Sequence, residues 1–181
     1  NDANDSDIVF QSEDGSGGVT EYFKVDGSAR DVVFNKDIHL LDNVDLKIGS
    51  SGDFRINHNG SNTFLTHQGT GELYIRNTND DGDLIFQGDD GSGGNTEYFR
   101  LDGGTTSMVA SKDIIFNDNI RAEFGNAGDF DIYHDGQDSF LENNAGNLSI
   151  VNYVNDSDII FKSDDGSGGV TEYFRVDGGV E

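Results

Sequence analysis

The chain has 181 residues, of which 35 are acidic and 11 basic, so its formal net charge is −24. A surface this acidic repels phosphate backbones, which excludes DNA and RNA as partners. The chain contains no Cys, so disulfides, thiolate metal sites and cysteine nucleophiles are excluded as well.

The apolar residues occur in short runs between clusters of Gly, Asp, Asn and Ser, and 25 residues are Gly. This composition is typical of short strands joined by turns, and no stretch keeps the spacing of an amphipathic helix. The sequence therefore predicts an all-β fold. No apolar run reaches membrane-spanning length, so we expect no membrane insertion. The many carboxylates are interpreted as a solvated surface, with cation binding as the alternative.

One motif organises the chain: Asp-Gly-Ser-Gly-Gly, followed after one residue by Thr-Glu-Tyr-Phe. It occurs at 14–23, 90–99 and 165–174, so the spacing is 76 and then 75 residues. Such regular repeats predict units that stack on one another. We expect one continuous rod made of unit 1 (1–76), unit 2 (77–151) and the start of unit 3 (152–181). Because the chain starts inside a repeat, we also expect it to be a piece of a longer protein.

The first part of each unit predicts a hairpin. Residues 7–12 and 21–26 alternate apolar and polar side chains, and the glycine-rich stretch between them permits a tight reversal. We expect Tyr22 and Lys24 to share the outward face, with the cation near the ring. The same pair recurs as Tyr98 with Arg100 and as Tyr173 with Arg175.

Further short strands with one apolar face follow in each unit. In unit 1 their apolar pairs are Val32 and Phe34, Ile38 and Leu40, Leu46 and Ile48, and finally Leu73 and Ile75. In unit 2 the corresponding pairs are Met108 and Ala110, Ile114 and Phe116, Ala122 and Phe124, and Leu148 and Ile150. About eight such strands per unit bury too little apolar surface for one unit to be stable alone, so we expect stacking, oligomerisation or both.

The middle of each unit predicts a second hairpin, because Asn-Gly and Asp-Gly favour two-residue turns. The turns are centred on Asn59-Gly60 and Asp135-Gly136. The expected cross-strand pairs are Phe54 with Leu65, Ile56 with Thr63, His58 with Ser61, Phe130 with Leu141, Ile132 with Ser139, and His134 with Gln137.

Three stretches, residues 53–60, 129–136 and 163–169, resemble repeats of tail-fibre proteins of marine tailed bacteriophages, cyanobacterial phages among them. The resemblance extends over essentially the whole chain. It implies an intertwined homotrimer in which three chains share one apolar axis, as an elongated β-solenoid or β-hairpin fibre shaft. It also implies a virion, extracellular location, contacts with other virion tail proteins, and host-receptor binding through a domain outside this segment. It carries over no catalytic residue.

Two groups of residues are candidates for binding ions. Asp14, Asp90 and Asp165 offer hard oxygen ligands for calcium, although an Asp at this position is also typical of an ordinary turn. His58 and His134 lie in the inward phase of their strands, so three chains about an axis would gather three copies of each, where a metal or an anion could bind. The alternative is a hydrogen-bonded histidine beside the hairpin turn. No other cofactor is expected.

We predict a structural role rather than catalysis. A catalytic carboxylate pair is expected once in a chain, whereas the acidic residues here recur with the repeat or lie in turns. The predicted function is therefore the shaft of a phage tail fibre that supports host attachment. The main alternative is a repeat segment of a bacterial extracellular adhesin or filament, with or without calcium, and a polysaccharide depolymerase is the third.

Overall fold

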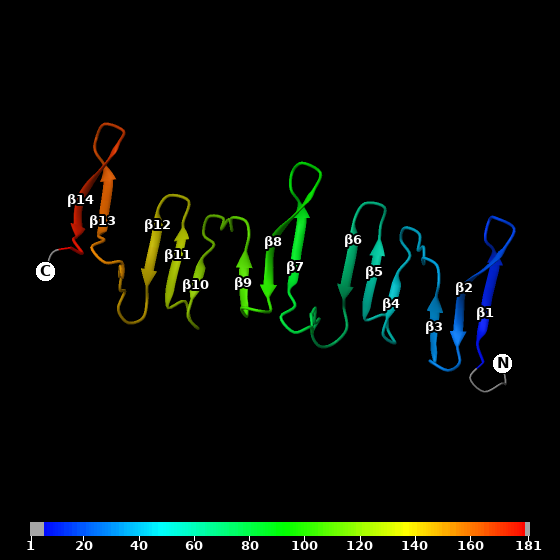
Figure 1. Cartoon of the computed structure of the whole chain (residues 1–181). Helices are drawn as coiled ribbons and strands as arrows, with labels where there is room; N and C mark the ends of the chain where they lie inside the picture. The colour runs from blue at the N-terminus through cyan, green and yellow to red at the C-terminus, as the bar shows by residue number, and fades with distance from the viewer. Residues whose placement is uncertain (1–5, 180–181) are drawn as a thin grey trace. The chain divides into compact units, whose positions relative to one another are not determined.

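The computed structural model describes residues 6–179. Within them the chain is all-β, as predicted, with fourteen strands and no helix (Figure 1). The described residues therefore include no long apolar helix of the kind that crosses a bilayer.

The strands lie in five small antiparallel sheets, each built from neighbours in the sequence. The first sheet contains β1 (Ile8–Glu13), β2 (Val19–Asp26) and β3 (Asp31–Phe34). The second contains β4 (Leu46–Ile48), β5 (Phe54–His58) and β6 (Thr63–His67). The third contains β7 (Leu84–Asp89), β8 (Asn95–Asp102) and β9 (Ser107–Ala110). The fourth contains β10 (Ala122–Phe124), β11 (Phe130–His134) and β12 (Ser139–Asn143). The fifth contains β13 (Ile159–Asp164) and β14 (Val170–Val176).

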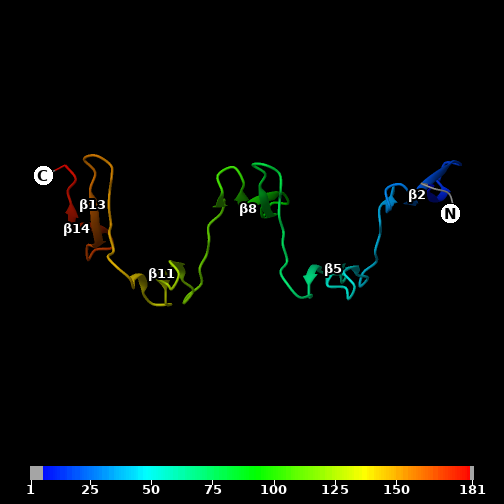
Figure 2. The same ribbon diagram turned by 90° about the horizontal axis from the view of Figure 1, so that it is seen from below.

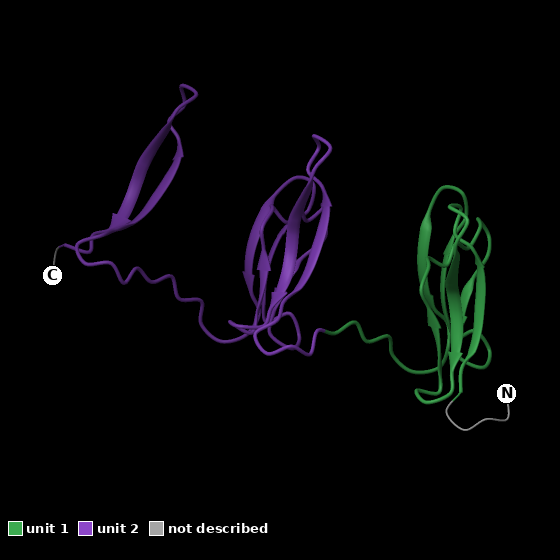
Figure 3. Cartoon of the chain, turned by 45° about the vertical axis from the view of Figure 1, so that its right-hand side comes forward, with its two compact units in different colours: residues 1–76 green, residues 77–181 purple. Residues whose placement is uncertain are grey.

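The chain forms two compact units, residues 1–76 and residues 77–181 (Figure 3). The second unit contains the second copy of the repeat and the beginning of the third. Among the described residues, strands contact only strands of their own sheet. No described apolar side chain is buried, so neither unit has a hydrophobic core of its own.

Each copy of the glycine-rich motif forms the loop of a hairpin, as predicted. Gly15 and Gly17 in the loop between β1 and β2 have φ values of 85° and 89°, which an L-residue rarely adopts. Asp14 N–H donates to Gly18 O at 3.0 Å and closes the loop.

A β-bulge interrupts the repeated hairpin at its tyrosine. Phe10 pairs with Phe23 and Gln11 with Glu21, so Tyr22 has no partner in β1. The same shift leaves Tyr98 without a partner in β7 and Tyr173 without a partner in β13. The extra residue interrupts the alternation of side chains along the strand. Glu21 and Phe23 would share a face in a regular strand, but the bulge places them on opposite faces.

The middle hairpins form, but the predicted register is wrong by two residues in both units. Ile56 pairs with Leu65 and His58 with Thr63, and the second unit repeats this with Ile132–Leu141 and His134–Ser139. The turn centre moves because the Asn59 side chain accepts hydrogen bonds from the N–H groups of Ser61 and Asn62 at 3.1 and 2.8 Å. Asn59 is therefore the residue before the turn, and Gly60, with a φ of 90°, is the first residue within the turn. A shift of two keeps every side chain on its expected face.

Four of the predicted strands are absent. The segments with Ile38 and Leu40, Leu73 and Ile75, Ile114 and Phe116, and Leu148 and Ile150 belong to no sheet. Figure 2 shows these segments as connections without secondary structure between successive sheets. Their side chains alternate as predicted, but a strand also requires a hydrogen-bonded neighbour, and these segments find none within residues 6–179.

Candidate functional site: an apolar face on each sheet

Each three-stranded sheet presents one apolar face to solvent. On the first sheet the register aligns Ile8, Val25 and Val32 in one row and Phe10, Phe23 and Phe34 in the next. The rings of Phe10 and Phe23 stack at 4.2 Å, and those of Phe23 and Phe34 at 5.6 Å. Phe10 nevertheless keeps 47% of its surface exposed.

The third sheet repeats this face with one ring missing. Phe86 and Phe99 stack at 4.4 Å, but Ala110 stands where the first sheet has Phe34. A hollow of about 320 Å³ lies beside Ala110, lined by Phe99, Met108 and Ile114 among others. The small side chain of Ala110 leaves this space open on the apolar face.

The second and fourth sheets carry the histidines on their apolar faces. Cross-strand rows bring together Leu46, Ile56 and Leu65 in one sheet and Ala122, Ile132 and Leu141 in the other. The histidines lie at the ends of these faces. Each borders a shallow hollow, of about 290 Å³ at His58 and about 400 Å³ at His134.

The histidine side chains have equivalent hydrogen bonds. His58 Nδ1 lies 3.1 Å from Thr63 Oγ1, and His134 Nδ1 lies 3.2 Å from Ser139 Oγ. Both partners are the cross-strand neighbours that the corrected register provides. Within residues 6–179 no three His, Asp or Glu side chains of the chain form a group that could hold a metal ion.

The loop carboxylates are engaged by their own loops. Asp14 Oδ1 accepts hydrogen bonds from the Ser16 N–H, the Ser16 hydroxyl and the Gly18 N–H at 2.8, 2.7 and 3.1 Å. Asp90 and Asp165 repeat the arrangement. The serine hydroxyl and then the backbone donors lower the pKa of all three carboxyls. One oxygen of each carboxylate therefore has a structural role.

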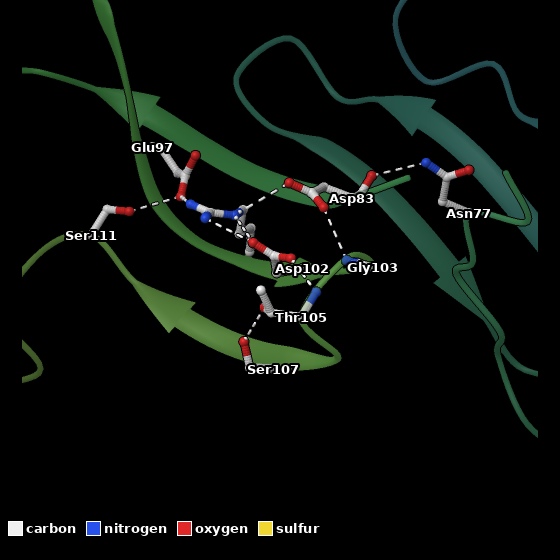
Figure 4. A network of polar contacts seen from close by, with 9 residues as sticks. Asn77, Asp83, Glu97, Asp102, Gly103, Thr105, Ser107 and Ser111 are labelled. Carbon is white, nitrogen blue, oxygen red and sulfur yellow. Dashed lines mark hydrogen bonds and ion pairs between the residues drawn. The ribbon is translucent and has the colours of Figure 1, made fainter. Parts of the chain in front are cut away.

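The opposite face of each hairpin sheet carries a cation surrounded by carboxylates. In the third sheet Arg100 lies 3.2 Å from Asp83, 2.8 Å from Glu97 and 2.9 Å from Asp102. Figure 4 shows these three carboxylates and the polar residues around them. The pKa of Glu97 is lowered, first by the hydrogen bond from Ser111 Oγ and then by Arg100. Lys24 and Arg175 occupy the same position in the other copies and also contact carboxylates.

The predicted contact between the tyrosine and this cation is wrong. Because of the bulge, Tyr98 borders the hollow on the apolar face, and its hydroxyl donates to Asp89 O at 3.0 Å. The bulge also brings Glu97 and Arg100 to one face, although residues three apart in a regular strand lie on opposite faces.

A second cluster, on the fourth sheet, was missed by the sequence analysis. Arg121 lies 2.8 Å from both Asp131 and Glu142, and its guanidinium is 3.7 Å from the centre of the Tyr133 ring. Tyr133 in turn stacks on Phe140 at 4.8 Å. The pKa of Arg121 is raised, most strongly by its hydrogen bond to Glu142 and less strongly by its hydrogen bond to Asp131. Aligning the two units would have revealed it, because Arg121 and Asp131 align with Asp45 and Arg55.

The chain matches no protein-family model, no curated protein and no solved structure.

Proposed function

We propose that this chain is a shaft segment of a phage tail fibre, in which identical chains, three in number, cover one another's apolar sheet faces. The main observation behind this proposal is that each sheet has one apolar and one polar face, yet no apolar side chain is buried within the described residues. A folded sheet with one apolar face requires another layer against that face. Among the described residues of each unit, strands contact only strands of their own sheet, so no sheet finds that layer within its unit.

The exposure of the apolar faces supports association. Large apolar side chains on these faces stay open to solvent, with Phe10 at 47%, Phe34 at 51% and Leu141 at 63% of their surface exposed. Removal of such surface from water is the main favourable contribution to protein association. An assembly of copies would cover these side chains.

The polarity of the two faces supports a shaft that is solvated outside and apolar inside. The clustered cations and carboxylates lie on the faces opposite the phenylalanine rows. The resemblance to tail-fibre repeats supports three copies and a location in the virion, in contact with other tail proteins. It also supports attachment to a host receptor through a domain outside this segment. The proposed role is mechanical: the shaft holds that domain away from the particle, and no enzymatic step is assigned to it.

Adjacent residues of β3 provide a test of the covered face. Val32 lies on the apolar face beside Val25, whereas Val33 lies on the polar face opposite Lys24. In the single chain Val32 is the more exposed of the two. An Asp at position 32 would be harmless in a monomer but would place a charge in a covered interface. An Asp at position 33 would lie next to a cation.

The experiment is native mass spectrometry and sedimentation of the 181-residue chain and its variants. We expect three copies for the wild type and for Val33→Asp, and loss of assembly for Val32→Asp. A monomeric wild-type chain with intact β-structure would contradict the proposal. The adhesin alternative would be favoured by a monomer that stacks only in the presence of calcium.

A further inference from the structure

Four short segments between the sheets have the pattern of strands but no strand partner. These linking segments are residues 37–40, 72–76, 113–116 and 147–151. Each carries two large apolar residues separated by one residue, which is the spacing of side chains on one face of a strand. Their side chains are among the most exposed of the molecule, with Ile115 at 85% and Tyr74 at 71%.

The backbone of the linking segments is unpaired. No backbone hydrogen bond joins these four ranges to any other part of the described chain. The hairpin strands on either side are paired along their full length. Extended backbone with free N–H and C=O groups and exposed apolar side chains is the arrangement that adds to the edge of another sheet.

We infer that the linking segments become β-strands by pairing with edge strands of a neighbouring copy of this chain. The inference rests on the proposed assembly and adds to it that the copies share hydrogen-bonded sheets instead of merely packing faces together. The sequence left open whether these strands pair within one chain or between chains, and the inference assigns the linking segments to pairing between chains.

A second copy is the partner that the chain itself favours. The apolar faces of the sheets remain open to solvent in the single chain, and a second copy carries the same faces. Each copy brings linking segments together with free sheet edges, so identical chains can satisfy one another symmetrically. The edge strands β6 and β9 carry no carboxylate, so the net charge of −24 does not oppose pairing at these edges.

Hydrogen exchange followed by mass spectrometry tests the pairing in the assembled wild-type chain. We expect the amides of residues 72–76 and 113–116 to exchange roughly 100-fold or more slowly than those of the loop at 91–94, and about as slowly as those of β5. If the chain assembles but these segments exchange as fast as the loop, the inference is wrong while the proposed function stands. If the chain is a monomer, both are wrong.

Two adjacent proline variants provide a second measurement. Successive N–H groups of a strand point to opposite sides, so either Tyr74→Pro or Ile75→Pro removes a donor that faces the neighbouring copy. We expect at least one of them to weaken assembly by about tenfold or more, since a single lost donor leaves an unsatisfied acceptor at the interface. Thr78→Pro, just beyond the segment, is the control. Assembly of both variants at the wild-type concentration would overturn the inference.

Discussion

Arg121 and Asp131 form an ion pair at 2.8 Å that the other unit builds from the same two positions with the charges exchanged, as Asp45 and Arg55 at 3.4 Å. Each version leaves one buried polar atom without a partner, Asp131 Oδ1 in one unit and Arg55 Nε in the other. Asp131 is only 5% exposed, so the position requires a complementary charge but tolerates either polarity.

The exchange predicts the behaviour of charge-reversal variants. Arg121→Asp leaves Asp131 facing another carboxylate, and Asp131→Arg leaves two cations side by side, so both should lower the melting temperature. The double variant restores opposite charges, and the new Arg would also lie opposite Glu142. We expect the double variant to melt above both single variants. If the decrease in melting temperature of the double variant equals the sum of the decreases of the two single variants, the two residues are not coupled.

Gly103 is predicted to resist substitution because the backbone approaches it closely. A Cβ at Gly103 would lie 2.7 Å from Gly82 O, whereas a Cβ at Gly104 would meet nothing closer than Asp102 Oδ1 at 3.7 Å. Gly103→Ala should therefore reduce the free energy of unfolding by about 1 to 3 kcal/mol through overpacking. Gly104→Ala is the matched control and should stay close to the wild type in denaturant titrations. Similar stabilities for the two would contradict the contact.

Filling the hollow on the third sheet should stabilise the chain. Ala110→Phe restores the third ring that Phe34 supplies on the first sheet, and a stacked ring pair contributes about 1 kcal/mol beyond its burial. Phe34→Ala makes the reverse change and should be destabilising. Thermal melts of both variants check the prediction. If Ala110→Phe lowers stability in the assembled protein, a neighbouring chain already occupies the hollow.

The loop aspartates predict a loss of stability in acid. Hydrogen bonds lower the pKa of Asp14, Asp90 and Asp165 below the ordinary value of 3.8. A carboxyl with a lowered pKa in the folded state stabilises it above the unfolded pKa, and this contribution is lost as the pH falls through the folded value. We expect stability to decrease below about pH 4. The triple variant with Asn at these positions should be less stable at pH 7 and should lose less on acidification.

Removal of calcium is expected to leave the fold unchanged. The Oδ1 atom of each loop aspartate is already held by three donors of its own loop. A chelator should therefore not shift the melting temperature of the chain. A clear decrease that added calcium reverses would assign the loops to calcium and favour the adhesin alternative.

The local pattern of the sequence was sufficient for the fold class, the glycine-rich hairpin loops and the apolar faces. These features depend on alternation of side chains and on residues that permit positive φ, and both are encoded within a few neighbouring positions. For the same reason, the faces of His58 and His134 were predicted correctly even though their cross-strand partners were displaced by two residues.

Features that depend on a partner strand were decided by the tertiary structure alone. The bulge at Tyr98 places Glu97 beside Arg100. Alternation within one strand cannot predict a bulge, because a bulge arises where two residues of one strand face a single residue of its neighbour. The side chain of Asn59, by accepting two backbone hydrogen bonds, moved the hairpin turn. Ile38, Leu73, Ile114 and Leu148 carry strand alternation yet lie outside every sheet, because alternation selects a face whereas a strand requires a neighbour to accept its hydrogen bonds.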